Sequence, residues 1–304
     1  MTITIRPIIV DDKEDVLSIA SRISLNYFEK VFDFWVNSPQ NLFYGIFIDD
    51  DLIGMADIFF HALKEAWLQG IRINPEYQRQ GLAFKLVDHL ENLCTNRSVK
   101  IIRFNTAPQN DAMIKLGKKR GYKETGDWIV YRVSAGEIKQ MLNNSEKPDK
   151  IPYNTLHVTP ISLFFSQYNH SVPPNGLLFS DFRTYTWQSI HNKTPVTHPI
   201  PYLVVSSDQR AGISVQDMSP ELHQTSLLGT TIGFGWGAIS KVVILIKLAI
   251  SQKLEEGYKK FRIGLPLSFE AVFSAFGFNL SDPNYPIFWK VFSKELGIKE
   301  RIDV

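Results

Sequence analysis

The sequence predicts an α/β protein with a mixed sheet, built from two units in series. Three observations support this class. Short strand-like apolar runs alternate with stretches of helical periodicity, a polar linker divides the chain, and the same order of elements recurs after the linker. The linker is the Pro-containing stretch 143–152. We therefore expect one domain at residues 1–145 and a second, related domain at residues 153–304.

In the first half, apolar alternation and helical spacing follow each other in the order β, α, α, β, β, β, α, β, α, β. Asp11 and Asp12 are suitable residues to cap the first helix. The predicted strands are 3–9, 43–48, 52–60, 67–73, 100–104 and 128–133, and the predicted helices are 11–23, 27–36, 81–93 and 109–120.

In the second half, the predicted strands are 202–206, 212–218, 226–234, 260–265 and 285–291, and the predicted helices are 239–256 and 268–276. Tyr44 and Gly121 are separated by nearly the same number of residues as Tyr202 and Gly277. Matching order at matching spacing indicates two copies of one unit, although little residue identity supports the repeat. The Gly-rich run 233–237 occupies the place of the first half's turn before a helix, but it lacks that turn's pattern, which favours a degenerate second copy.

Composition excludes several classes of function. The chain has 304 residues, 44% of them hydrophobic, and a formal charge of +2, so no global field attracts nucleic acid. The longest apolar run, 242–250, is too short to span a bilayer, and the N-terminus has no signal-peptide pattern. The single cysteine, Cys94, fits a reducing compartment, and the seven histidines show no metal-ligand spacing. We expect a soluble cytoplasmic protein without a metal, a membrane partner or a nucleic-acid partner.

The most informative segment is a strand, a short turn and a helix start at residues 68–83. Gly81 and Ala83 remove side-chain bulk at the beginning of the helix, where unpaired backbone N–H groups and the helix dipole favour an anion. Gln78 and Arg79 add polar side chains before them. Taken alone this pattern is weak, because strand–glycine turn–helix occurs in many folds.

The surrounding residues make it specific. The turn resembles the coenzyme A loop of the GNAT N-acetyltransferase superfamily, which has Arg/Gln-x-x-Gly-x-Gly/Ala after a strand. The fit comprises Gln78, Gly81 and Ala83, with Ile71, Ile73 and Pro75 before them, and then Asn105, Asn110, Ala112, Leu116 and Gly121–Tyr122 in a second motif. The resemblance covers most of residues 1–133 and implies a GNAT fold and acetyl-coenzyme A as cosubstrate.

By that resemblance, the backbone of Ile71, Arg72 and Ile73 would pair with the pantetheine arm like an added strand. The pyrophosphate would bind the turn formed by Gln78, Arg79, Gln80, Gly81, Leu82 and Ala83, and Asn110 would contact the coenzyme near the diverging strands. The N–H of Ile71 would stabilise the oxyanion. The expected reaction is direct transfer of the acetyl group to a primary amine.

The sequence departs from the family at the catalytic positions. Gly117 stands where many members place a Tyr that protonates the thiolate, and Gln69 stands in the region where many carry a Glu. The nearest titratable candidates for a general base are Asp57, His61 and Glu65, and solvent is an alternative. Tyr27, Phe28 and Trp35 belong to the segment that in this family covers the acceptor, so we expect an aromatic lid suited to a small amine.

A narrower and more diffuse resemblance concerns histidine N-acetyltransferase-like proteins, which pair a GNAT unit with a related C-terminal region. It rests on stretches 19–23, 34–39, 70–73 and 176–183 and makes an amino acid a plausible acceptor. Two alternatives remain open: a coenzyme A-binding sensor or scaffold without turnover, which the missing Tyr and Glu favour, and a protein N-acetyltransferase. The sequence gives neither the acceptor nor the oligomeric state.

Overall fold

The computed structural model describes residues 2–22, 27–62, 64–144, 151–156, 177–180, 186–189, 202–218, 229–278 and 287–296. The chain divides into two compact units. The N-terminal unit comprises Met1–Phe104, Asn110–Lys123 and Phe292–Val304, and the C-terminal unit comprises Asn105–Gln109 and Glu124–Val291. Both are mixed α/β structures, which confirms the predicted fold class.

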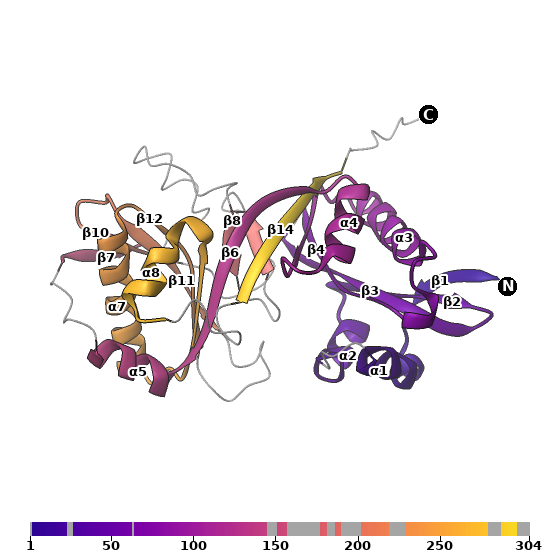
Figure 1. The fold of residues 1–304 in the computed structure, drawn as a ribbon, viewed down its shortest axis with the longest axis horizontal. Coiled ribbons are helices and arrows are strands. Elements are labelled where there is room, and N and C mark those ends of the chain that lie inside the picture. Colours follow the sequence, from indigo (N-terminus) through magenta and orange to yellow (C-terminus); the bar gives the residue numbers. More distant parts are fainter. Residues whose placement is uncertain are drawn as a thin grey trace. The chain divides into compact units, whose positions relative to one another are not determined.

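The N-terminal unit is a sheet with helices on both faces (Figure 1). Its strands lie in the order β1-β2-β3-β4-β5, antiparallel except for the parallel pair β4–β5. Its elements are β1(Ile3–Pro7), η1(Val10–Asp12), α1(Lys13–Ser21), α2(Phe28–Asn37), β2(Asn41–Ile48), β3(Asp51–Ala62), β4(Glu65–Ile73), η2(Pro75–Tyr77), α3(Leu82–Asn96), β5(Ile101–Thr106) and α4(Asp111–Lys119). The strands and helices predicted between residues 3 and 120 are confirmed, with bounds that shift by a few residues, whereas the strand predicted at 128–133 lies in the C-terminal unit.

Side chains along β3 point alternately to the two faces of the sheet, and both faces are covered by helices. Met55 packs in the cluster formed with α1 and α2, whereas Ala56 and Ile58 pack in the cluster formed with α3. Asp57 therefore lies on the same face as Met55, beneath the aromatic residues of α2. That face carries the candidate site.

Asp12 does not cap the first helix through its side chain, contrary to the expectation. Its carboxylate instead accepts hydrogen bonds from the backbone N–H of Ile9, at 2.8 Å, and from the Arg6 guanidinium, at 2.8 and 2.9 Å. The Arg6 guanidinium lowers the pKa of Asp12 through these hydrogen bonds. Asp12 thus holds the end of β1 to the start of α1.

The last described strand, β14(Ile287–Glu295), returns the chain to the N-terminal unit from Phe292 onward. The fully buried Phe292 ring stacks on Phe104 with centroids 4.9 Å apart. Lys294 forms an ion pair with Glu91 of α3, and the Leu296 N–H donates to the Lys100 carbonyl at 2.8 Å. Residues distant in sequence therefore complete the packing of the N-terminal unit.

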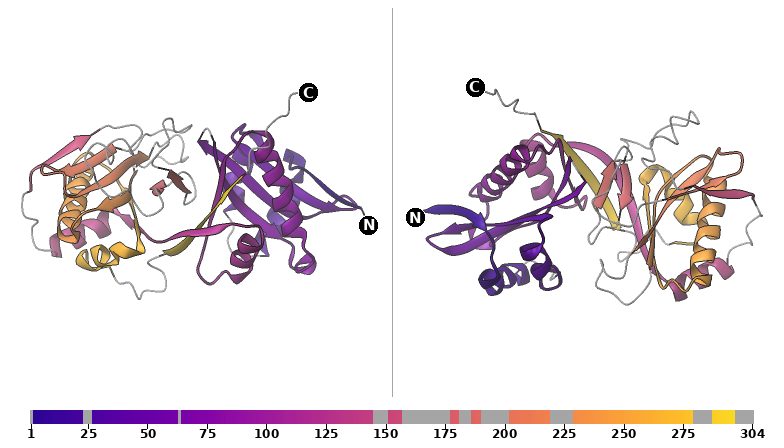
Figure 2. Two further views of the ribbon diagram at one scale, coloured as in Figure 1. Left: turned by 90° about the horizontal axis from the view of Figure 1, so that it is seen from above. Right: turned by 180° about the vertical axis from the view of Figure 1, so that it is seen from behind.

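In the C-terminal unit the strand order is β6-β13-β12-β11-β10-β7, with β8–β9 as a separate pair. Figure 2 shows the ribbon from two further sides. Only β12–β13 is parallel among these pairs. The elements are β6(Lys123–Ser134), α5(Ala135–Asn144), β7(Tyr153–Leu156), β8(Leu177–Ser180), β9(Thr186–Ser189), β10(Tyr202–Ser206), β11(Gly212–Met218), β12(Gly229–Trp236), α7(Ile239–Glu255), β13(Lys260–Pro266), η4(Leu267–Phe269) and α8(Glu270–Ala275). The short strands β7, β8 and β9 and helix α5 were not predicted. Residues 176 and 181–183, part of the narrower resemblance, lie outside the described residues.

The two units share one irregularity. In each, a strand with an antiparallel partner on one side and a parallel partner on the other contains a β-bulge, at Gly70 of β4 and at Gly233 of β12. In each, the parallel pairing stops before the bulge, at Trp67 in β4 and at Ile232 in β12. The two units thus have this bulge and its place relative to the parallel pair in common, and the predicted repeat stays a prediction. Among the described residues, no helix is long and apolar enough to cross a membrane.

Candidate active site

The candidate site is built around the bulge in β4. Met55 pairs with Arg72 and Asp57 with Gln69, so Gly70 and Ile71 together lie opposite Ala56 alone. Gly70 has φ +66°, a left-handed conformation that favours glycine. A Cβ atom there would lie 2.7 Å from the Trp35 ring. The ring and the backbone therefore both require glycine at this position.

Before the bulge, after Trp67, the pairing of β4 with β5 ends. The register of this parallel pair covers only Glu65–Ile101, Ala66–Ile102 and Trp67–Arg103. The edge of β4 from Leu68 to Ile73 has no register partner on β5. Backbone groups along such an edge can pair with an extended molecule that enters between the strands.

The start of α3 is free of side-chain caps. Its N-cap residue, Gly81, has φ +77° and no side-chain cap hydrogen bond, and no acidic residue lies in the first turn. Gln78, which precedes it, turns its side chain back and donates to the Ile73 carbonyl at 3.1 Å. Gln80 and Gly81 are exposed. The N–H groups that open α3 are therefore available to an anion.

Helix α4 starts differently. The Asn110 side chain accepts a hydrogen bond from the Met113 N–H at 3.2 Å, so this helix caps itself. Asn110 was predicted to contact the coenzyme; the structure assigns its side-chain oxygen a capping role, and the predicted contact stays untested. Of the two helices in this part of the N-terminal unit, α3 rather than α4 is therefore the candidate anion site.

Near the bulge, Asp57 is the described acidic residue whose pKa departs most from its usual value. It is fully buried, and burial raises its pKa to about 7 against two opposing hydrogen bonds. Both bonds reach Oδ2, from Asn41 Nδ2 at 2.6 Å and from Gln69 Nε2 at 2.8 Å. A carboxyl group that titrates near neutral pH is suited to accept a proton during turnover.

The other two candidate bases have different surroundings. Glu65 is buried and forms an ion pair with Arg103, whose Nη1 lies 2.6 Å from Oε2, so its charge is already compensated. The side chain of His61 lies outside the described residues. Geometry therefore favours Asp57 over Glu65 as a base.

The aromatic residues expected to form a lid are packed against the bulge. Phe28 and Trp35 are almost completely buried and meet edge to face, with ring centroids 5.4 Å apart. Tyr27 stacks on Phe28 with centroids 4.7 Å apart, and burial raises its pKa. These rings cover the face of the sheet on which Asp57 of β3 lies.

The absence of a tyrosine at position 117 has a steric reason. A Cβ atom on Gly117 would lie 2.5 Å from the Phe104 ring, the ring on which Phe292 stacks. Tyr122 is buried with Phe104 in the core, and burial raises its pKa well above the usual range. Among the described residues, neither position offers a tyrosine suited to protonating a thiolate.

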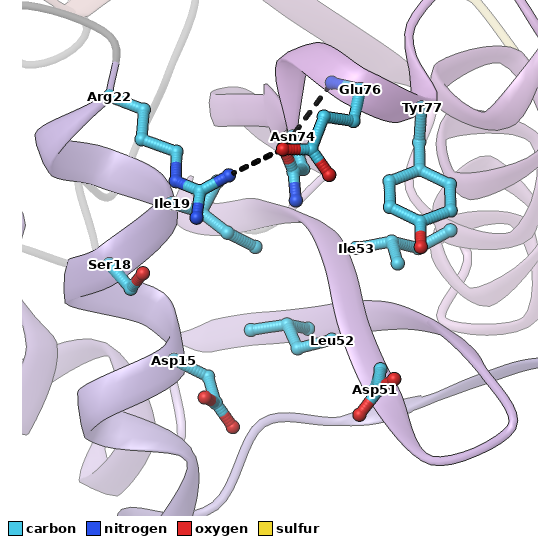
Figure 3. Close-up of a pocket in the computed structure, with 10 residues that line it drawn as sticks. All are labelled: Asp15, Ser18, Ile19, Arg22, Asp51, Leu52, Ile53, Asn74, Glu76 and Tyr77. Carbon is cyan, nitrogen blue, oxygen red and sulfur yellow. Dashed lines mark hydrogen bonds and ion pairs between the residues drawn. The ribbon is translucent and has the colours of Figure 1, made fainter.

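A pocket of about 250 Å³ lies beside the turn after β4 (Figure 3). Arg22 donates there to Asn74 and pairs with Glu76, at 3.3 and 3.4 Å. Asp15 and Asp51 also line it, so acids outnumber bases and a polyanionic coenzyme is disfavoured. This pocket is separate from the anion site at α3.

Sequence reasoning missed Asn41 and Arg103. Asn41 follows Pro39 and Gln40 and resembles an ordinary turn residue, and its contact with Asp57 depends on the pairing of β2 with β3. Cys94, predicted to be a small core residue, is confirmed as buried, and burial raises its pKa to about 12. No group of three or more possible metal ligands occurs in the described part of the chain.

Comparison with known proteins identifies a family domain in the first part of the chain. Residues 9–122 match the model of the acetyltransferase (GNAT) family. These residues form a GNAT acetyltransferase domain, as the sequence resemblance implied. Members of this family transfer acyl groups from acetyl-coenzyme A. Among curated proteins, no sequence matches the chain significantly.

Solved structures agree on the fold. A GCN5-related N-acetyltransferase from Sphaerobacter thermophilus matches with a TM-score of 0.55 at 11% identity, covering 96% of this chain and 95% of its own. The ribosomal-protein-S18-alanine N-acetyltransferase from Escherichia coli matches 41% of this chain and 81% of its own at 26% identity and a TM-score of 0.39. The PaiA N-acetyltransferase from Thermoplasma acidophilum, solved with coenzyme A, matches 41% of this chain and 91% of its own at 22% identity and a TM-score of 0.35. The first match shows that the fold is shared over nearly the whole chain.

Proposed function

We propose that the protein is an acetyl-coenzyme A-dependent N-acetyltransferase that acts on a primary amine of a small molecule such as an amino acid. The observation that carries this proposal is the bulged edge of β4, open toward β5, beside the uncapped start of α3. The open edge of β4 suits an extended thioester arm, and the start of α3 suits a diphosphate. Ile71, Arg72 and Ile73 would bind the arm, and the turn Gln78–Ala83 would bind the diphosphate.

The chain's own groups supply a direct transfer. Asp57 would accept a proton from the ammonium form of the acceptor, and the neutral amine nitrogen then attacks the thioester carbonyl. The Ile71 N–H would stabilise the oxyanion at the bulge, where Ile71 has no register partner on β3 or β5. The N–C bond forms as the C–S bond breaks, and the thiolate takes up the second amine proton.

A rival proposal is a coenzyme A-binding sensor or scaffold without turnover, favoured by Gly117 and by the ion pair that occupies Glu65. A third makes the acceptor a protein amine; the buried, apolar packing of Phe28 and Trp35 favours a small acceptor instead. An acceptor screen that follows thiol release from acetyl-coenzyme A, with amino acids, polyamines and peptides in parallel, separates the three. If none of these acceptors is acetylated although the coenzyme binds tightly, the result would favour the sensor.

We further propose that the C-terminal unit is a degenerate copy that binds no coenzyme. The loop before α7 is packed against its own unit, because a Cβ atom on Gly237 would clash with the Arg210 carbonyl. Lys241, in the first turn of α7, is paired with Asp208. The start of α7 has no side-chain cap, but the Asp208 carboxylate beside it would oppose an incoming diphosphate. The boundaries 1–145 and 153–304 and a cytoplasmic location stay predictions.

Calorimetric titration with acetyl-coenzyme A is therefore expected to give one site per chain. The start of α3 is open, whereas the start of α7 faces the Arg210 carbonyl and Asp208. The double change Asp208→Ala with Lys241→Ala should leave the stoichiometry unchanged. Two equivalent sites per chain in the wild type would contradict the proposed degeneracy.

The pH dependence of turnover should report on Asp57. Its folded-state pKa of about 7 lies above the usual value, so the group is protonated and inactive as a base at lower pH. We expect kcat/KM for the acceptor to rise with pH through about 7, as this carboxyl group ionises. In Asp57→Asn that rising limb should vanish and kcat should fall by about a hundredfold or more. A limb that persists unchanged in Asp57→Asn would assign the titration to another group.

Trp35→Ala is expected to raise the acceptor KM by about tenfold while acetyl-coenzyme A affinity changes little. Trp35 covers Gly70 on the sheet face that carries Asp57. The proposed anion site is elsewhere, at the start of α3, which follows the end of β4. Steady-state kinetics with each substrate varied in turn gives the measurement, and Trp35→Phe serves as the conservative control. An equal loss of coenzyme affinity would contradict the assignment of this ring to the acceptor side.

A further inference from the structure

Asn41, Asp57 and Gln69 form a polar cluster on three neighbouring strands, β2, β3 and β4. Asp57 is completely buried and Asn41 is 7% exposed, whereas Gln69 is half-buried and immediately precedes Gly70. The cluster therefore begins in the core and ends at the bulge. It lies on the sheet face covered by α1 and α2.

The hydrogen bonds within this cluster are unevenly distributed. Both amide groups donate to Asp57 Oδ2, while Asp57 Oδ1 and Asn41 Oδ1 are buried without a hydrogen-bond partner among the described residues. A buried polar atom without a partner destabilises the fold, and most such atoms are satisfied in native proteins. The cluster thus presents two acceptor oxygens, a negative charge when Asp57 is ionised, and a need for donors.

The rings around the cluster favour a cationic donor. Tyr27 stacks on Phe28 and meets Trp35 edge to face at 6.0 Å. Burial raises the pKa of Tyr27, while the charge of Arg72 lowers it and the charge of Asp57 raises it. Arg72 itself donates to its neighbour's carbonyl, Ile71 O, at 2.7 Å, and lies 5.7 Å from the Phe28 ring centroid. Aromatic faces beside a carboxylate bind ammonium groups well.

We propose that Asn41 and Asp57 bind the acceptor nitrogen as a primary ammonium ion, with Asn41 as a positioning residue. This rests on the proposed function. The ammonium donates to the two Oδ1 atoms, and one of its protons passes to Asp57, leaving a neutral amine. After attack, the nitrogen loses its second proton to the departing thiolate, and Asp57 returns its proton to solvent. The site selects amines over alcohols, because a hydroxyl group brings one donor and no charge.

Asn41→Leu tests the assignment, since leucine keeps the approximate volume and removes both polar atoms. We expect the acceptor KM to rise tenfold or more, with the acetyl-coenzyme A affinity unchanged. The rising limb of kcat/KM should also shift to higher pH, because Asp57 loses a hydrogen bond that favours its charged form and lowers its pKa. Asn41→Thr, which retains an acceptor oxygen, should recover part of the loss and also serves if the leucine variant fails to fold.

Thr230→Val in the C-terminal unit is the matched control, because Thr230 is 1% exposed and donates to the Gln216 carbonyl at 3.3 Å. It should lower stability without changing the acceptor KM. If Asn41→Leu and Asn41→Thr both turn over the acceptor with wild-type KM and pH profile, the inference is overturned while the proposed function stands.

A binding measurement separates the two proposals. With coenzyme A present, benzylamine should raise the melting temperature of the wild type and leave that of Asn41→Leu unchanged, and benzyl alcohol should affect neither. This result without turnover of any amine would support the ammonium site and reject the enzyme. Equal stabilisation by benzylamine and benzyl alcohol would reject the ammonium site.

Discussion

Gly81→Glu is expected to abolish acetyl-coenzyme A binding, with a loss of affinity of about a hundredfold or more. The change places a carboxylate at the N-cap of α3, where it can cap the free N–H groups itself and repel a diphosphate. A charge-assisted hydrogen bond contributes about 1.5–3 kcal/mol, and about 1.4 kcal/mol corresponds to tenfold in affinity. The loss of one or two such bonds therefore accounts for the expected effect.

Backbone strain is the competing explanation, because Gly81 has φ +77°. Gly277 offers a matched control: it has φ +78°, is exposed like Gly81, and a Cβ atom at either position would meet nothing within 4 Å. Gly277→Glu imposes the same strain in the C-terminal unit and should leave the affinity unchanged. Isothermal calorimetry on both variants gives the comparison, and wild-type affinity in Gly81→Glu would remove the anion site from α3.

The parts of the fold and site predicted from sequence depend on local patterns. The turn from Gln78 to Ala83 and the helix after it follow from residues close together in the chain, and a glycine with positive φ is a local requirement. Strands β10 and β11 were predicted to the residue because alternating apolar runs are bounded by turn residues. The residues proposed to bind the coenzyme could therefore be predicted from local sequence, without knowledge of tertiary contacts.

The parts that were missed depend on pairing between distant strands. Glu65 is a candidate base by sequence, and in the structure it forms an ion pair with Arg103, 38 residues later. Asn41 joins Asp57 only because β2 and β3 pair in one register, and Gln69 joins it only because the bulge at Gly70 sets the facing of β4. Such contacts carry no signal in a single sequence, since each residue alone is compatible with a solvated turn or strand end.

The return of β14 is the largest such long-range effect, and Phe292→Ala measures it. Phe292 is completely buried, and its ring lies 7° from parallel to that of Phe104. Truncating a buried Phe costs about 3–5 kcal/mol, partly through the cavity that remains. We expect the melting temperature to fall by about 10 °C, given about 2–4 °C per kcal/mol for a unit of this size.

Phe288→Ala is the control on the same strand, because Phe288 is only half-buried and packs against the core of the C-terminal unit. Its loss should be distinctly smaller, and only Phe292→Ala should speed hydrogen exchange of the β5 amides next to Phe104. Equal effects of the two changes would mean that β14 stabilises the N-terminal unit no more than a peripheral strand does. Should Phe292→Ala act as expected, residues 1–145 alone would lack the ring that packs on Phe104, the ion pair to Glu91 and the bond to Lys100. The proposed coenzyme-binding unit would then depend on residues from Phe292 onward, which belong to the same compact unit, for part of its core.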